Sequence, residues 1–429
     1  MVRRWEPFVL LGSCLVLLAA CGLVVGVSLL GWLLVGPPDV LSRLPGRAVA
    51  VNRLVVQGED HNIYVVRPDG SGRVALTDDA SSVRRYRQPV WSPKGDFIAW
   101  AEVSPGGGGM SGALIVSRPD GQDRLRVETA SPPFYIAWSP DARRLVFLRS
   151  RGPRLALDLV DLTARRPEAK ELDGGRSYYL DWSPDSRRLL AHVDRDELSL
   201  VEMDGQKTAL DVQLGRFPAP QWTPDGKAVI YAARVDGQQR LIVADLAGNV
   251  RQTVASVEGQ VSFVLSPDGR RLAYAISPEG VRAAAFGSLH VADLDTGETQ
   301  EISDGPVLAF FWSPNSQRLL FVQLDASLPS FPDSLVARHD RIWFRWRVWD
   351  GKRTRSLSRF VPTETFLGSY LLFFDQYARS MTLWSPDSRA FVYAGVRSNG
   401  QSGIWVESVE EEGSPSFVMP GVLAAWSPR

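Results

Sequence analysis

The side chains best suited to acid–base or metal chemistry in this chain are four histidines: His61, His192, His290 and His339. His192 and His290 lie in apolar, strand-like runs, at positions that other parts of the chain fill with ordinary strand residues. We therefore expect both to have packing roles. A group of histidines that meet at one axis of the fold stays open as an alternative.

Carboxylates recur mainly in sequences that predict turns. Residues 293–298, DLDTGE, alternate carboxylates as a calcium loop does, but no twelve-residue loop with a terminal Glu follows. A glycine-rich stretch at 104–112, SPGGGGMSG, predicts a hairpin tip, because it lacks the Lys-Ser/Thr of a phosphate-binding loop. The sequence therefore predicts no metal site and no cofactor.

The elements that would position any functional residue come from one repeated stretch. It reads WSPDSRRLL from Trp182, and related stretches begin at Trp91, Trp138, Trp222, Leu265, Trp312, Trp384 and Trp426. Successive copies are 47, 44, 40, 43, 47, 72 and 42 residues apart. Its Pro and Asp favour a tight turn. In the copies that carry it, this Asp is therefore first a turn former.

Each repeat unit predicts four short strands. Around Trp222 they are PAPQW, KAVIYAA, RLIVADLAGN and VRQTVA. Periods of 40 to 50 residues with four strands per unit are typical of a β-propeller. The strand at 52–56 has no such turn before it, and the last copy, 422–429, has no strands after it. We expect the C-terminal strand to become the innermost strand of the blade built from 51–85.

The predicted fold is thus all-β: an eight-bladed β-propeller over residues 51–429. Seven blades remain the alternative if the long unit after Trp312 does not form an ordinary blade. The chain has 48 basic and 48 acidic residues, so its formal net charge of zero gives no electrostatic reason to expect nucleic acid as a partner.

The N-terminus predicts a membrane anchor. Residues 8–36 form an uncharged run that is long enough for one transmembrane helix. Residues 37–50 follow as a linker. Two arginines before this run favour a cytoplasmic N-terminus and an extracytoplasmic propeller. Alternatively, LAAC ending at Cys21 resembles a bacterial lipobox, in which Cys21 would be lipidated. Either anchor would export the propeller to the bacterial cell envelope.

The WSPDG turn followed by a hydrophobic pair and an IYVxDxDG-like hairpin resembles the repeat of TolB-type propellers. Similar repeats occur in the propeller domains of prolyl oligopeptidases, dipeptidyl peptidases and tricorn proteases. The resemblance covers almost all of residues 51–429. TolB proteins have six blades and a separate N-terminal α/β domain, and this chain departs from both. The resemblance implies the fold, and fold alone does not imply activity.

The peptidases of this resemblance carry a separate α/β-hydrolase domain with a Gly-x-Ser-x-Gly elbow. This chain contains no such elbow. We therefore expect no hydrolase activity of that kind.

The 72-residue unit between Trp312 and Trp384 differs most from the others, because it carries two additions, at 327–340 and 363–380. Between them, residues 341–349 read as a strand in which Phe344, Trp346 and Val348 share one face. Its other face carries Trp343, Arg345, Arg347 and Trp349, where Arg and indole side chains can stack.

The addition at 363–380 predicts an amphipathic helix, capped by Thr363 or Thr365, that connects one blade to the next. Its simplest interpretation is a plug whose aromatic residues pack on the blades. The alternative is a partner or ligand site. The residues that we predict for such a site are Trp343, Arg345, Trp349, Phe373, Asp375, Gln376 and Tyr377.

The sequence as a whole predicts a membrane-anchored, TolB-like β-propeller that binds a protein or peptide, or scaffolds an envelope complex, without catalysis. Two alternatives stay open: a propeller hydrolase or lyase with a site in the central channel, and an extracytoplasmic ligand sensor.

Overall fold

The computed structural model describes residues 51–106, 109–277, 287–303, 305–325, 342–410 and 413–429. Apart from 162–167, these residues belong to one compact unit. The predicted anchor at 8–36, the linker at 37–50, Cys21 and the addition at 327–340 lie outside the described residues. Among the residues described, no helix is long and apolar enough to cross a membrane.

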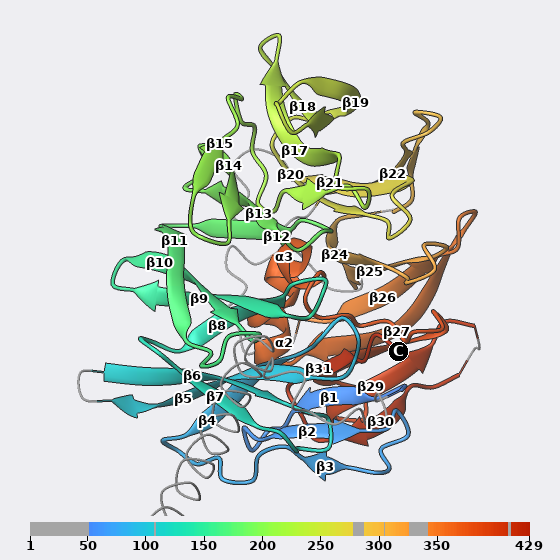
Figure 1. The fold of residues 1–429 in the computed structure, drawn as a ribbon. Helices are drawn as coiled ribbons and strands as arrows, with labels where there is room; N and C mark the ends of the chain where they lie inside the picture. The colour runs from blue at the N-terminus through green and yellow to red at the C-terminus, as the bar shows by residue number, and fades with distance from the viewer. Residues whose placement is uncertain (1–50, 107–108, 278–286, 304, 326–341, 411–412) are drawn as a thin grey trace, which may run out of the picture. The chain divides into compact units, whose positions relative to one another are not determined.

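The described strands form antiparallel sheets that follow one another along the chain (Figure 1). The first sheet contains β31 (Leu423–Trp426), β1 (Leu54–Gln57), β2 (Ile63–Val66) and β3 (Val74–Ala75). The second contains β4 (Arg85–Trp91), β5 (Ile98–Gly106), β6 (Gly109–Ser117) and β7 (Leu125–Thr129). The third contains β8 (Pro133–Trp138), β9 (Arg144–Arg151), β10 (Arg154–Asp161) and β11 (Ala169–Gly175).

Three further four-stranded sheets have the same order. The fourth contains β12 (Tyr178–Trp182), β13 (Arg188–Val193), β14 (Glu197–Glu202) and β15 (Lys207–Ala209). The fifth contains β16 (Gln221–Trp222), β17 (Ala228–Val235), β18 (Gln238–Asp245) and β19 (Val250–Ser256), as predicted for that unit. The sixth contains β20 (Gln260–Leu265), β21 (Arg271–Ser277), β22 (Leu289–Asp293) and β23 (Thr299–Glu301).

The remaining sheet has seven strands and holds the long unit. It contains β24 (Val307–Trp312), β25 (Leu319–Leu324), β26 (Phe344–Trp349), β27 (Thr354–Pro362), β28 (Ala390–Val396), β29 (Ser402–Ser408) and β30 (Ser416–Met419). The two halves join because the end of β27 pairs with β28, Val361 opposite Val396. The repeat at Trp384 contributes only a single bridge, to Phe391.

The WSPD stretch forms the predicted turn between the first and second strand of a unit. In one copy, the Asp185 carboxylate accepts hydrogen bonds from the Ser183 hydroxyl and the Arg187 N–H. The residue after the Asp lies in the left-handed region, where Gly226 has φ 67° and Ser186 has φ 62°. Because glycine adopts this conformation without strain, it suits the position. The prediction that each Asp is a turn former is confirmed.

In several copies of the repeat, the tryptophan links neighbouring sheets by a hydrogen bond, whereas the buried indole nitrogens of Trp182 and Trp222 have no partner among the described residues. The Trp138 indole N–H donates to the Val90 carbonyl at 3.4 Å, and the Trp312 indole donates to the Val264 carbonyl at 3.0 Å. In both cases the acceptor stands just before the corresponding repeat residue of the preceding sheet. The innermost strands of successive sheets are in contact, β4 with β8 and β20 with β24. The repeat thus fixes both the turn and the spacing between sheets.

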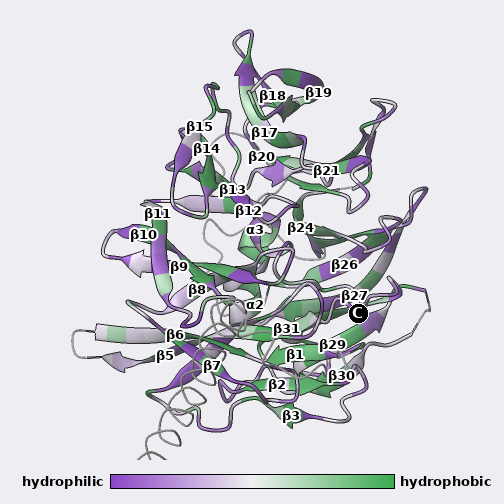
Figure 2. Ribbon diagram, in the orientation of Figure 1, coloured by the Kyte–Doolittle hydropathy of each residue, from purple (hydrophilic) through white to green (hydrophobic). Residues whose placement is uncertain are grey.

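The first and last described strands pair as predicted. β31 pairs with β1, Trp426 opposite Leu54, and the Trp426 indole donates to the Asn52 side chain at 2.9 Å. Figure 2 shows hydrophobic residues along β1 and β31, and both strands are buried throughout. The C-terminal strand is therefore the innermost strand of the first sheet.

Residues 363–384, here called the crossing segment, connect β27 to β28. They contain α2 (Glu364–Ser369), the 3₁₀ turn η2 (Leu371–Phe373) and α3 (Phe374–Tyr377). The Thr363 side chain caps α2 by accepting from the Phe366 N–H, which confirms one of the two predicted caps. The predicted single helix is wrong, because the backbone leaves the helical region at Tyr370, with φ −126°.

Candidate functional site

The crossing segment packs against the innermost strands of several sheets. α3 contacts β12, β20 and β24, while α2 contacts β28. Phe374 packs on Phe310 with ring centroids 4.6 Å apart, and Tyr370 stacks on Phe311 at 5.7 Å. All four rings are buried. The predicted plug is therefore present, and aromatic packing holds it.

Two predicted site residues in α3 bind the segment to the sheets by hydrogen bonds. The Gln376 side chain donates to the Leu180 carbonyl at 2.9 Å and accepts from the Leu180 N–H at 3.0 Å. The Tyr377 hydroxyl donates to the Phe134 carbonyl at 2.6 Å and accepts from the Gln88 amide at 3.0 Å. These bonds position α3 and use most of the hydrogen-bond donors and acceptors of both side chains.

Asp375 carries a buried carboxyl group within the crossing segment. Burial raises the pKa of its carboxyl to about 7, and hydrogen bonds from the Gln376 N–H, Ser262 and Ala219 offset this only in part. Its Oδ2 atom has no hydrogen-bond partner among the described residues. A buried carboxylate without a cation is costly, which favours the neutral acid.

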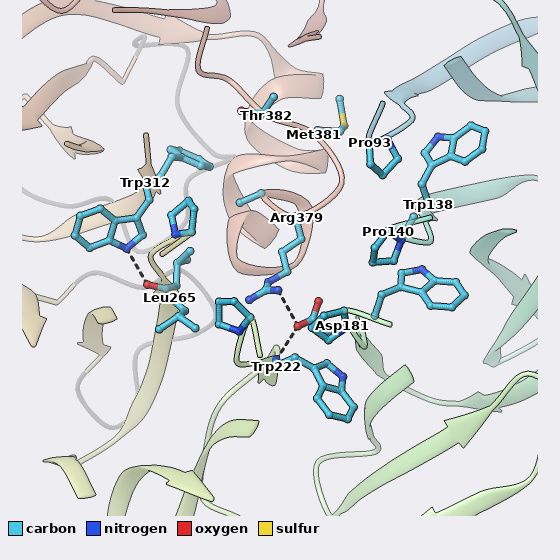
Figure 3. A pocket seen from close by; sticks show the side chains of 18 of the residues that line it. Pro93, Trp138, Pro140, Asp181, Trp222, Leu265, Trp312, Arg379, Met381 and Thr382 are labelled. Atoms are coloured by element: carbon cyan, nitrogen blue, oxygen red, sulfur yellow. Dashed lines mark hydrogen bonds and ion pairs between the residues drawn. The ribbon is translucent and has the colours of Figure 1, made fainter. Parts of the chain in front are cut away.

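One pocket opens where the innermost strands end in the WSPD turns. This turn pocket, of about 540 Å³, is lined by repeat residues from several sheets and by the end of the crossing segment (Figure 3). Arg379 and Asp181 form an ion pair there at 2.8 Å, and the same Asp181 oxygen accepts from the Trp222 N–H at 2.8 Å. Burial raises the pKa of Asp181, and the Arg379 guanidinium lowers it in part.

A second pocket opens at the opposite ends of those strands, where β4, β8 and β12 begin. This arginine pocket, of about 940 Å³, is lined by Arg85, Arg87 and Arg176, by tyrosines, and by Phe373, Gln376 and Tyr377 of the crossing segment. Three of the six exposed large hydrophobic side chains of the described residues line it: Val83, Met110 and Phe373, at 58%, 55% and 42% exposure.

The predicted site residues separate into two groups. Phe373, Gln376 and Tyr377 line the arginine pocket, and Asp375 is buried beside them in α3. Trp343, Arg345 and Trp349 lie instead on or beside β26, within the seven-stranded sheet. The structure does not place these two groups in one pocket.

The β26 residues have partners within the sheets. Arg345 pairs with Asp325 at 3.0 Å, and the Arg359 guanidinium stacks over Trp343 at 5.1 Å. Arg271 lies over Trp349 at 5.8 Å. The predicted Arg–indole stacking is thus present, but its cations come from other strands.

His192 and His290 have the packing roles that the sequence predicts. His192 stacks on Phe217 at 4.3 Å and His290 stacks on Tyr274 at 5.2 Å. Among the described residues, no three His, Cys, Asp or Glu side chains lie together as metal ligands would.

Sequence reasoning missed Arg87, Gln88 and Arg379. The signal for the first two was their place just before the repeat tryptophan, where every unit starts an innermost strand. The signal for Arg379 was that it is a cation at the end of the aromatic-rich addition at 363–380.

No protein-family model matches the chain, and no curated protein matches it. Among solved structures, it is similar to dihydro-heme d1 dehydrogenase NirN, with 17% identity, coverage of 91% of this chain and 78% of that chain, and a TM-score of 0.53. It is also similar to TolB from Acinetobacter baumannii, with 17% identity, coverage of 62% and 66%, and a TM-score of 0.35. A third similar structure is puromycin hydrolase, with 18% identity, coverage of 65% of this chain and 49% of that chain, and a TM-score of 0.42.

The chain thus aligns with less than two thirds of the TolB and puromycin hydrolase chains. TolB proteins, which the sequence of the repeat resembles, are thus among the solved structures that this chain is similar to, and at these identities the similarity concerns the fold alone.

Proposed function

We propose that this chain is a binding module: a TolB-like β-propeller that captures a protein or peptide in the bacterial envelope, without catalysis of its own. In this proposal residues 8–36 hold it in the membrane as a single-pass anchor, with the propeller extracytoplasmic. Cys21 lipidation is the alternative anchor.

The observation that carries the proposal is the apolar rim of the arginine pocket. Val83, Met110 and Phe373 come from three different parts of the chain and stay exposed around one opening. Exposed hydrophobic side chains that gather rather than scatter are typical of interaction sites. Tyrosines below the rim offer contact area and hydrogen bonds, as interface residues commonly do.

We also propose that the propeller has eight blades. The six four-stranded sheets would be six blades, and the seven-stranded sheet would supply two more. β24 to β27 would form one blade, and β28 to β30 with the Trp384 bridge would form the other. The crossing segment would then take the place of most of an innermost strand.

A capture experiment tests the binding proposal. Full-length protein solubilised from membranes would be used as bait, with a Met110→Ser, Phe373→Ser variant beside it. We expect the variant to lose the partner that the unmodified chain retains. Val250→Ser is the matched control, because Val250 is 45% exposed on β19 and does not line the pocket. Equal recovery by the pocket variant and the unmodified chain would show that the partner binds elsewhere.

The location needs its own measurement. We expect the full chain to resist extraction from membranes at high pH and the propeller to be cleaved by protease added to spheroplasts. A Cys21→Ala variant that loses its membrane association would favour the lipid anchor. Protection of the propeller in intact spheroplasts would contradict export.

A further inference from the structure

The arginine pocket has an unbalanced charge. Its lining includes Arg85, Arg87 and Arg176, but no Asp or Glu. The chain as a whole has equal numbers of basic and acidic residues, so this imbalance is local. None of the three arginines forms an ion pair with another described residue. A cavity lined by one sign of charge attracts ligands of the opposite sign.

Arg87 is the innermost of these cations. Its side chain is half-buried, its Nε atom is buried without a partner among the described residues, and its Nη2 donates to the Pro133 carbonyl at 3.4 Å. Burial lowers the pKa of the guanidinium. A guanidinium offers five donors in a planar fork. Within the described residues the Pro133 carbonyl takes one of these donors, so further donors on the Nη atoms are left for a ligand in the pocket.

The strand that carries Arg87 is distorted at the pocket. The β4–β5 register shifts between Arg87 and Val90, which is a β-bulge. Gln88, inside the bulge, has φ 55°, in the left-handed region that non-glycine residues rarely adopt. Bulges re-aim side chains, and backbone strain of this kind gathers at functional sites.

The bulge residue is itself incompletely bonded. The Gln88 amide donates to the Tyr377 hydroxyl at 3.0 Å, which holds it against α3. Its Oε1 atom is buried and has no partner among the described residues. His61, which also lines the pocket, has φ 65°. Two non-glycine residues with left-handed backbone conformations thus line the same pocket as Arg87.

We propose that the arginine pocket binds a carboxylate carried on an apolar or aromatic body, with Arg87 bonding the carboxylate. This inference rests on the proposed binding function and names the ligand chemistry. One inner guanidinium matches the planar carboxylate in shape and charge. The body of the ligand lies toward Phe373, Met110 and Val83. A free organic acid and the C-terminus of a peptide share this chemistry.

Binding of matched probes to the full-length protein tests the inference. One pair is N-acetyl-Ala-Ala-Phe with a free C-terminal carboxylate and the same peptide as the C-terminal amide. The other pair is 4-phenylbutyrate and 4-phenylbutyramide. We expect each acid to bind at least about tenfold more tightly than its amide, since a charge-assisted bond to a guanidinium is worth that much. Isothermal calorimetry gives the dissociation constants.

Variants assign the preference to Arg87. Arg87→Gln should bind acid and amide equally, while Arg87→Lys, which keeps the charge but loses the fork, should keep part of the preference. Arg85→Gln is the matched control, because Arg85 is an exposed arginine of the same lining, and it should retain the preference. Thermal denaturation of each variant checks that the fold is intact.

The outcomes separate this inference from the binding function. Equal affinity for acid and amide, or no binding of any probe at about 1 mM, which corresponds to only about 4 kcal/mol, would overturn carboxylate recognition. The capture experiment with Met110 and Phe373 would still decide the binding function. If the peptide acid binds more tightly than 4-phenylbutyrate, the source is a C-terminus; the reverse indicates a small organic acid. Either result supports the shared chemistry.

Discussion

Asp375 should make the propeller less stable as the pH rises toward neutrality. Its folded-state pKa is raised from 3.8 to about 7 by burial, whereas the unfolded chain exposes the carboxyl to water. Between these values the folded state holds a proton that the unfolded state has lost. Stability falls with pH wherever the folded state binds more protons. The contribution is therefore most favourable in acid and is lost as the pH rises through about 7.

The size of the effect follows from the two pKa values. Each pKa unit corresponds to about 1.4 kcal/mol. For a pKa that rises from 3.8 to about 7, the free energy of unfolding should fall by about 2.5 kcal/mol between pH 5 and pH 8 through Asp375 alone. Asp375→Asn removes the titration and keeps the shape. The variant should therefore gain that amount relative to the unmodified protein over the same range.

Urea denaturation at pH 5 and pH 8 measures both proteins. Asp225→Asn serves as the control, because Asp225 is a turn carboxylate whose pKa is lowered by its bond to Thr223. Its contribution has the opposite sign, present above the unfolded pKa and lost in acid. Parallel stability profiles for Asp375→Asn and the unmodified chain would refute the reasoning, because they would mean that Asp375 is not buried as a neutral acid.

Three further predictions concern the crossing segment and the closure of the fold. Phe374→Ala, at a 2% exposed position, should lower the free energy of unfolding by about 3–5 kcal/mol in urea denaturation. Phe373→Ala, at a 42% exposed position, should lower it by less than about 1 kcal/mol. Similar losses for the two variants would contradict the packing described. Arg379→Met should cost about 3–5 kcal/mol by stranding buried Asp181, and adding Asp181→Asn should recover part of it in thermal denaturation. Removing residues 423–429 should expose the edge of β1 and abolish cooperative unfolding, measured by circular dichroism.

The strands could be predicted because their signals are local. The turn at Trp222 to Gly226, the apolar runs beside it and the hairpin at Gly248 each depend on a few consecutive residues, and β16 to β19 form there. The closing strand could be predicted because the repeat unit from residue 51 lacks the strand that residues 422–429 supply. Repetition made each of these signals visible several times.

The broken helix and the unpaired arginine could not be predicted, because both depend on distant contacts. Phe366, Tyr370 and Phe374 recur at helical spacing, but the chain kinks at Tyr370, whose hydroxyl donates to the Met381 carbonyl at 2.7 Å. Arg87 resembles the other arginines of the sequence. It is distinguished by the left-handed residue Gln88 in the bulge of β4 and by a pocket lining that contains no Asp or Glu.

The two pockets differ in what determines their residues. Many residues that line the turn pocket are Trp and Pro of the repeat, which turn geometry and contacts between sheets already require. The arginine pocket lies near the starts of the innermost strands, where the repeat prescribes no residue. There β4 contributes Arg87, β8 contributes Tyr135 and β12 contributes Tyr179. Side chains that the scaffold does not require are free to match a ligand. Recognition by this propeller is therefore best sought at the arginine pocket.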